Sequence, residues 1–138
     1  MSSEIDFGAL REAAHDVMTR AYAPYSGFSV GAAAVSESGH IVTGCNVENV
    51  SYGLGVCAEV SVVSAAVSSG AGRLRAVSVC DADGNVLTPC GRCRQVLLEI
   101  GGDGLLIDGA DHPRALAELL PEAFGPADLA RVRDGGRR

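Results

Sequence analysis

Three cysteines in two widely separated segments constrain the fold of this chain more than any other feature of its sequence. Cys57 begins the sequence CAE, and Cys90 and Cys93 enclose two residues in the sequence PCGRC. Three thiolates can hold a zinc ion and leave its fourth tetrahedral position to water, which is the arrangement of a catalytic rather than a structural zinc. A fold that uses this chemistry must bring the two segments together.

Glu59 follows the first of these cysteines by two positions. A carboxylate at that distance can handle protons at the open zinc position without binding the metal itself. The spare thiols, Cys45 and Cys80, fall in segments with strand-like composition and are interpreted as buried apolar residues. The three histidines are interpreted as surface residues and not as ligands: His15, His40 and His112.

The length of 138 residues and the hydrophobic content of 47% predict a single domain with a substantial core. We expect this domain to span residues 1–130, followed by an arginine-rich, disordered tail over residues 131–138. The start of the sequence has no basic region followed by an apolar run, and no stretch approaches the roughly 18 apolar residues that span a bilayer. The sequence therefore predicts a cytoplasmic protein without a membrane partner.

Charge and cysteine usage narrow the function further. A net charge of −6 argues against a nucleic-acid polymer as partner, because such affinity depends on basic residues that neutralise phosphates. A small, uncharged substrate fits better. All 11 basic residues are arginine, so Schiff-base catalysis by lysine and a Walker-type phosphate loop are excluded. The odd number of cysteines, 5, favours metal or redox chemistry over a disulfide framework.

Hydrophobic periodicity predicts helices that alternate with strands. Helices are expected over residues 5–21, 57–70, 90–100 and 113–120, from apolar spacing of three and four residues and from the Gly and Pro residues at their ends. Strands are expected over residues 28–35 and 40–47, which form a hairpin, and over residues 76–80, 86–88 and 105–108. This alternation predicts an α/β fold, a three-layer α-β-α sandwich with a mixed sheet of about five strands.

Both cysteine segments open predicted helices. Unpaired backbone amides and the positive end of the helix dipole stabilise thiolates at such positions. Two of these helix starts, side by side, would gather the three sulfurs around one ion.

With these motifs in place, the sequence resembles the small homotetrameric, zinc-dependent cytidine deaminases. Their zinc signature combines a first Cys or His ligand, a glutamate that is not a ligand, and a CxxC pair. Four motifs follow in order over nearly the whole chain: YSGFSVGA at residues 25–32, GCNVEN at 44–49, CAE with PCGRCRQ, and LLPEAFG at 119–125.

The resemblance implies hydrolytic deamination of cytidine and 2′-deoxycytidine to uridine and 2′-deoxyuridine, a step of pyrimidine salvage, with one zinc per chain. It assigns the metal to Cys57, Cys90 and Cys93 and the proton shuttle to Glu59. It also implies a homotetramer with shared active sites. The resemblance implies that Asn46 and Glu48 bind the ribose hydroxyls. It also implies that Phe28 stacks on the base, that the backbone N–H of Ala58 binds the pyrimidine carbonyl, and that Phe124 reaches the site of a neighbouring subunit.

One position departs from the family. Many members of this size carry Arg directly after the glutamate, where this chain has Val60. Zinc with three thiolates and a hydroxide carries a net charge of about −2, and the positive ends of two helices offset about one of these negative charges. We expect Arg92 to supply the remaining compensation, because its guanidinium can donate several hydrogen bonds to thiolate. Blasticidin S deaminases resemble the chain in the same run, CGRCRQ.

Three alternatives stay open at this stage. The first is the same chemistry on another cytosine nucleoside such as blasticidin S, which the Asn46 and Glu48 pair disfavours because a ribose requires a paired donor and acceptor there. The second is a zinc-stabilised binding domain without activity. The third is a redox protein in which the CxxC pair needs no metal.

Overall fold

A five-stranded sheet with the strand order β2-β1-β3-β4-β5 forms the centre of the computed structural model, which describes residues 4–135. The strands are β1 (Val30–Ser36), β2 (Ile41–Cys45), β3 (Leu74–Asp81), β4 (Leu106–Ile107) and β5 (Arg114–Ala115). β1 pairs antiparallel with β2 and β3, β3 pairs parallel with β4, and β4 pairs antiparallel with β5. The sheet is therefore mixed, as predicted.

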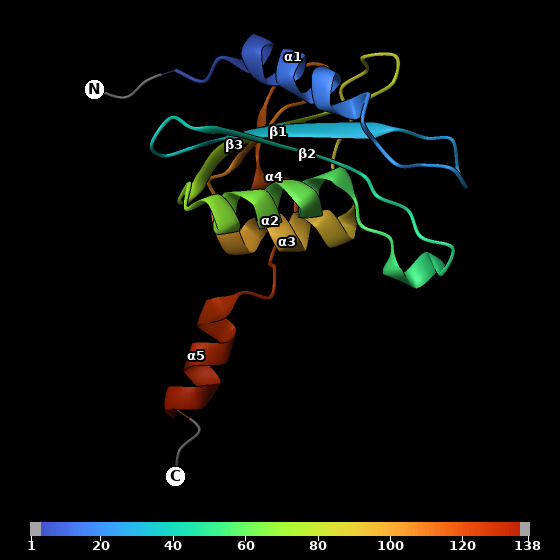
Figure 1. Cartoon of the computed structure of the whole chain (residues 1–138). Helices are drawn as coiled ribbons and strands as arrows, with labels where there is room; N and C mark the ends of the chain where they lie inside the picture. Colours follow the sequence, from blue (N-terminus) through green and yellow to red (C-terminus); the bar gives the residue numbers. More distant parts are fainter. Residues whose placement is uncertain (1–3, 136–138) are drawn as a thin grey trace.

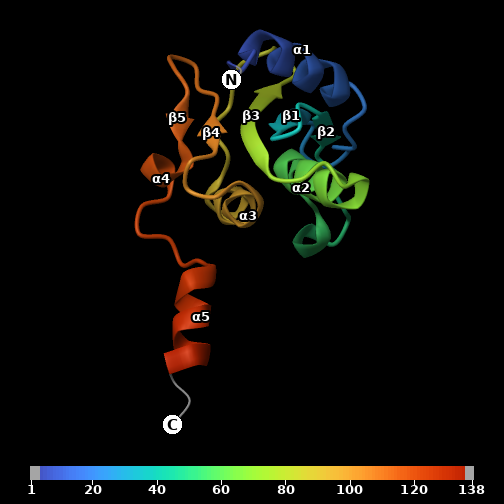
Figure 2. The same ribbon diagram turned by 90° about the vertical axis from the view of Figure 1, so that its left-hand side faces the viewer.

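Helices cover both faces of the sheet. Helix α1 (Phe7–Met18) lies on one face, and helices α2 (Ala58–Ser69) and α3 (Gly91–Gly101) lie side by side on the other (Figure 1). Turning the molecule shows the same order of layers, with the sheet between α1 and the α2–α3 pair (Figure 2). The predicted three-layer α-β-α sandwich is confirmed.

Two glycines in the hairpin allow the helices to approach the sheet closely. A Cβ atom at Gly31 would lie 2.0 Å from the carbonyl oxygen of Ala14 in α1, and one at Gly44 would lie 2.7 Å from the amide nitrogen of Val62 in α2. Real Cβ atoms do not tolerate such contacts, so a side chain at either position would push a helix away from the sheet. The two positions thus help to set the spacing of both layers.

The core consists of two clusters, one on each face of the sheet. The larger lies under α2 and α3 and contains Val62, Val77 and Leu97; the smaller lies under α1 and contains Leu10 and Cys80. Burial of Cys80 agrees with its interpretation as an apolar residue. Because Cys80 lies on the α1 face, the sheet separates it from α2 and α3.

Several element boundaries differ from the predictions. Residues 86–88 form no strand and make one isolated bridge, from Val86 to Cys80. The helix predicted over residues 113–120 shrinks to α4 (Leu116–Leu119), because Arg114 and Ala115 pair with β4 as the edge strand β5. A 3₁₀ turn, η1 (Tyr52–Leu54), precedes α2.

The last described element is helix α5 (Pro126–Gly135), which extends away from the body of the molecule (Figures 1 and 2). Residues 131–135 are therefore helical, whereas disorder was expected from residue 131 onward; residues 136–138 lie outside the described part. Pro126 suits the first helical position, and the Asp128 carboxylate accepts the Gly125 amide at 2.9 Å, so the start of the helix is well stabilised. Among residues 4–135, no helix has the length and apolar character needed to cross a membrane.

Candidate metal centre

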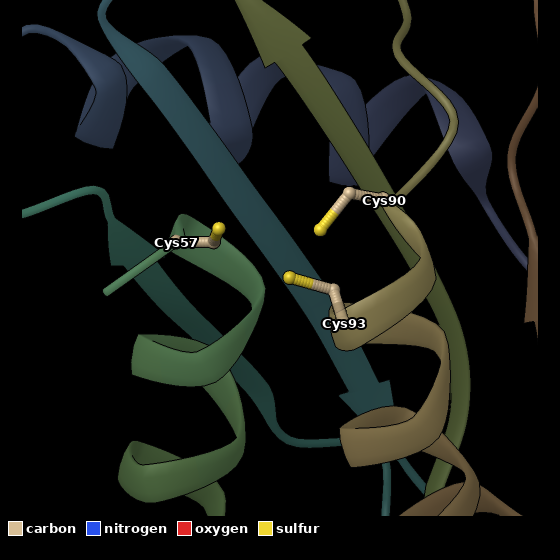
Figure 3. A group of neighbouring side chains, drawn as sticks. All are labelled: Cys57, Cys90 and Cys93. Carbon is tan, nitrogen blue, oxygen red and sulfur yellow. The ribbon is translucent and has the colours of Figure 1, made fainter. Parts of the chain in front are cut away.

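The three sulfurs singled out in the sequence lie together in the structure. The Sγ atoms of Cys57, Cys90 and Cys93 lie within 4.8 Å of one another. Figure 3 shows the side chains converging from the first turns of α2 and α3. Cys57 is the N-cap of α2, Cys90 is the N-cap of α3, and Cys93 is the third residue of α3. The predicted grouping of these residues at two adjacent helix starts is confirmed.

The backbone of α3 favours a thiolate at Cys90. Its pKa is lowered, chiefly because the backbone N–H of Cys93 donates a hydrogen bond to its sulfur, and the backbone N–H of Arg92 contributes as well. These amides have no acceptor within their own helix, so their positive ends stabilise the charged form of the nearby sulfur. The N-terminus of α3 thus favours the anionic form of one sulfur.

Burial acts in the opposite direction on the other two cysteines. It raises the pKa of Cys57 and the pKa of Cys93, whose side chain is fully buried. Nearby negative charge from Glu59 raises both pKa values further. Without a cation these two sulfurs therefore remain protonated at neutral pH, and a bound cation is what would stabilise three thiolates at such short range.

The donor set fits zinc. Thiolate ligands select zinc and other soft metals, and a three-cysteine site leaves the fourth position of a tetrahedron open. Within residues 4–135 the clustered group holds these three ligands and no histidine or carboxylate. The arrangement is that of a catalytic zinc site and lacks the fourth protein ligand of a structural one.

Glu59 lies in the first turn of α2, directly beside the sulfurs. The residue is 5% exposed. Burial raises the pKa of its carboxyl group, because a low-polarity environment disfavours the charged form. The Cys93 side chain lies close enough to lower this pKa by a smaller amount. A raised pKa brings the exchange of a proton closer to neutral pH, as acid–base catalysis requires.

Asn46 fastens the segment that carries Phe28. Its Oδ1 accepts the Val30 amide at 2.9 Å, and its Nδ2 donates to the Phe28 carbonyl at 2.9 Å. Phe28 itself is 53% exposed, so its ring remains available for stacking. The amide of Asn46 therefore holds the turn that leads into β1.

Glu48 holds the same turn from the other side. Its Oε1 accepts the backbone amides of Tyr25 and Ser26 at 2.9 and 3.1 Å, and its Oε2 accepts the Ser26 hydroxyl. These bonds lower the pKa of Glu48, with the Ser26 hydroxyl as the largest cause. The role of Ser26 was missed from the sequence, although the residue lies within the YSGFSVGA motif.

A cavity of about 280 Å³ opens beside this turn. Its lining comprises Tyr25, Ser26, Glu48, Asn49, Tyr52 and Gly55. Gly55 precedes Cys57 by two residues, so the cavity adjoins the segment that leads to the metal centre, although none of the three cysteines lines it. Its size and its aromatic and carboxylate lining suit a small polar molecule.

The remaining predicted residues differ in how closely they approach the centre. Ala58 is buried as the first residue of α2, where its N–H has no acceptor within the helix. Arg92 is exposed in the first turn of α3, and its backbone N–H helps to lower the pKa of Cys90. Phe124 is 67% exposed on the segment between α4 and α5.

Comparison with known proteins identifies the family. The model for the cytidine and deoxycytidylate deaminase zinc-binding region matches residues 8–107, which include all three cysteines and Glu59. The chain belongs to this family. It is therefore a zinc-binding deaminase, and Cys57, Cys90 and Cys93 form the metal-binding group of that domain.

Relatives within the family share most of the chain. A cytidine deaminase of Mycobacterium tuberculosis is 58% identical over 130 residues, covering 94% of this chain and 98% of the relative. The crystal structure of cytidine deaminase from Mycobacterium tuberculosis matches with a TM-score of 0.87, covering 88% of this chain and 99% of that one at 58% identity. The enzyme from Mycobacterium leprae matches with a TM-score of 0.84 at 46% identity, covering 86% and 100%.

Proposed function

We propose that this deaminase hydrolyses cytidine and 2′-deoxycytidine to uridine and 2′-deoxyuridine with release of ammonia. The observation that carries the proposal is the buried Glu59 carboxyl group beside three clustered sulfurs that leave one zinc position open. The relatives named cytidine deaminase, at up to 58% identity over nearly their whole length, support the same substrate class.

Glu59 serves as the proton shuttle. Zinc, when bound by Cys57, Cys90 and Cys93, lowers the pKa of a water molecule toward neutrality. Glu59 accepts a proton from the attacking water and delivers it to ring nitrogen 3 of the cytosine, which keeps it in the product. Glu59 then takes the proton of the hydroxyl group added at carbon 4 and gives it to the amine, which leaves as ammonia as the carbonyl forms. Its raised pKa suits both directions of transfer, since each step needs a carboxyl group that changes its protonation state near neutral pH.

The surrounding residues bind and orient the nucleoside. The N–H of Ala58 meets the pyrimidine carbonyl, and Phe28 stacks on the base. Asn46 and Glu48 bind the ribose hydroxyls with the hydrogen-bonding capacity left after they fasten the turn at Tyr25–Val30, because a carboxylate has about four acceptor sites and an amide two donors. The cavity lined by Glu48 and Tyr52 supports a sugar site at this place.

The functional unit we propose is a homotetramer in which Phe124 completes the site of a neighbouring subunit. Phe124 and Tyr52 are 67% and 82% exposed, and an isolated subunit gains nothing from large apolar groups left in water. We further propose that the enzyme acts in the cytoplasm, in pyrimidine salvage, because a reducing compartment keeps its thiols available for zinc.

The alternatives explain the structure less well. A zinc-stabilised binding domain would not require a buried carboxyl group with a raised pKa at the metal centre, since burial of such a group costs stability. A redox protein would use the CxxC pair alone and leave Cys57 without a role. Blasticidin S remains the competing substrate, and the Asn46 and Glu48 pair favours a ribose over it.

The decisive assay follows the fall of cytidine absorbance with the purified, zinc-loaded protein, with blasticidin S in parallel and Glu59→Gln as the inactive control. We expect turnover of cytidine and 2′-deoxycytidine at rates typical of enzymes, on the order of 1–1000 per second. Turnover of blasticidin S alone, or of neither compound, would refute the proposed substrate class.

A further inference from the structure

Two side chains that follow the last metal ligand connect α3 to a distant segment of the chain. Arg94 is half-buried; its Nε donates to the Pro89 carbonyl at 2.8 Å and its Nη1 donates to the Leu119 carbonyl at 2.7 Å. Gln95 donates from Nε2 to the Phe124 carbonyl at 2.7 Å. The N-terminal half of α3 thus holds both ends of the segment 119–124.

The hydrogen bond from Arg94 to the Pro89 carbonyl affects the metal centre. Pro89 directly precedes Cys90, which is the most exposed of the three cysteines and is the N-cap residue of α3. Cys93 is fixed by its place within the helix, whereas the position of Cys90 depends on how the chain enters α3. By holding the Pro89 carbonyl, Arg94 fixes the peptide that leads into Cys90.

The segment 119–124 needs such support. Glu122 has a φ of 53°, the one positive φ at a non-glycine position among the described residues. Such backbone conformations are unfavourable for a residue with a side chain and persist where the surroundings hold them. Leu119 is the last residue of α4, so its carbonyl accepts no hydrogen bond from within the helix. The Arg94 guanidinium donates a hydrogen bond to it instead.

We propose that Arg94 is a positioning residue that couples zinc binding at Cys90 to the conformation of the segment 119–124. Gln95 holds the other end of this segment without contact to the metal-binding peptide, and the two residues together set the placement of Phe124. Zinc fixes Cys90 and the Pro89 carbonyl; Arg94, bonded to that carbonyl, is then held in the orientation that supports Leu119. The coupling is reciprocal by linkage, so loss of the Arg94 contacts also weakens zinc. The inference rests on the proposed zinc site and does not depend on the identity of the substrate.

The test combines zinc affinity, from chelator competition, with hydrogen exchange of a peptide spanning the segment 119–124. Removing zinc from the wild type should speed exchange in this peptide and leave the β1–β2 hairpin unchanged. Arg94→Ala should speed exchange with zinc bound and weaken zinc by about 10- to 100-fold, as loss of a group that orients a ligand typically does. Gln95→Glu, which replaces the donor, should speed exchange but leave zinc affinity within about twofold.

Glu99→Ala, an exposed change on the same helix, is the matched control and should alter neither quantity. If Arg94→Ala does not fold, Arg94→Lys replaces it in the test. One ammonium group cannot donate to both carbonyls, so this variant should show a smaller loss of zinc affinity and a smaller rise in exchange. Wild-type zinc affinity and exchange in the Arg94 variant, or unchanged exchange on zinc removal, would overturn the inference. A protein that lacks cytidine turnover but gives the expected affinities and exchange would refute the proposed function alone.

Discussion

The Glu59 carboxyl group and the Cys93 thiol, on two different helices, lie close enough to shift each other's pKa beyond the effect of burial: the Cys93 side chain lowers the pKa of Glu59, and the negative charge of Glu59 raises the pKa of Cys93. This contact places the proton-carrying group beside the sulfurs, although Glu59 is not among the clustered ligands. It also links the two segments that the sequence separates, since α2 contributes the carboxyl group and α3 the thiol. The chemistry of the site therefore depends on how closely these two helices pack.

Replacing Glu59 by Gln should abolish most turnover and leave the metal in place. Gln fits the same space but cannot carry a proton, and one acid–base group contributes about 10²- to 10⁴-fold to the rate. Steady-state kinetics together with the zinc content of the purified variant give the answer. Retention of more than about a tenth of the wild-type activity would show that another group moves the protons.

Zinc uptake by the metal-free protein should release protons at pH 7. The pKa values of Cys57 and Cys93 lie above the ordinary range, so both groups hold protons at this pH and must lose them to bind the metal. Apparent zinc affinity should therefore rise with pH between about pH 6 and 8. Titration in weakly buffered solution with a pH indicator measures the release, and uptake without proton release would contradict these pKa directions.

Replacing Arg92 by Ala tests the expected charge compensation, which stays a prediction. Loss of the positive charge should move the acidic limb of the pH–rate profile upward, because the group that must deprotonate for activity loses a stabilising cation. The shift should be below about one pH unit, since an exposed charge contributes at most about 1 kcal/mol. Zinc retention should weaken in parallel, and no change in either quantity would refute the role.

Replacing Arg11 by Ala should destabilise the fold far from the metal centre. Arg11 in α1 makes a two-pronged bond to the buried Asp108 carboxylate at 2.7 and 2.8 Å, and the Ser78 hydroxyl donates to the same group at 2.7 Å. Without Arg11 the buried Asp108 carboxylate is left with the neutral Ser78 hydroxyl as its partner, which should lower the free energy of unfolding by about 3–5 kcal/mol.

Arg20→Ala provides the control for this prediction, because Arg20 pairs with Asp16 on the exposed surface of α1 at 3.6 Å. Its removal should cost less than about 1 kcal/mol. The free energy of unfolding from urea titration compares the two variants. Equal losses would mean that the buried contact does not determine how α1 attaches to the sheet.

The metal centre was predictable because its chemistry restricts the residue types. A three-sulfur zinc site needs cysteines at helix starts, and both segments carried those signals in the sequence. The Glu59 position followed from the same logic. The long elements were predictable as well, since α1 and the β1–β2 hairpin have clear periodicity.

The rest depended on contacts that the sequence does not reveal. β5 has two residues and no periodicity of its own, and it forms because β4 offers an edge. Arg94 and Gln95 bond to backbone carbonyls, so no partner residue type marks them in the sequence. Helix α5 begins at Pro126 and includes residues 131–135, where the high arginine content had predicted disorder.

X-ray absorption at the zinc edge of the purified protein tests the central claim most directly. The structure and the family predict one zinc per chain with three sulfur neighbours at about 2.3 Å and one oxygen neighbour at about 2.0 Å. Four sulfur neighbours, or a nitrogen ligand in the fourth position, would contradict a catalytic zinc held by Cys57, Cys90 and Cys93.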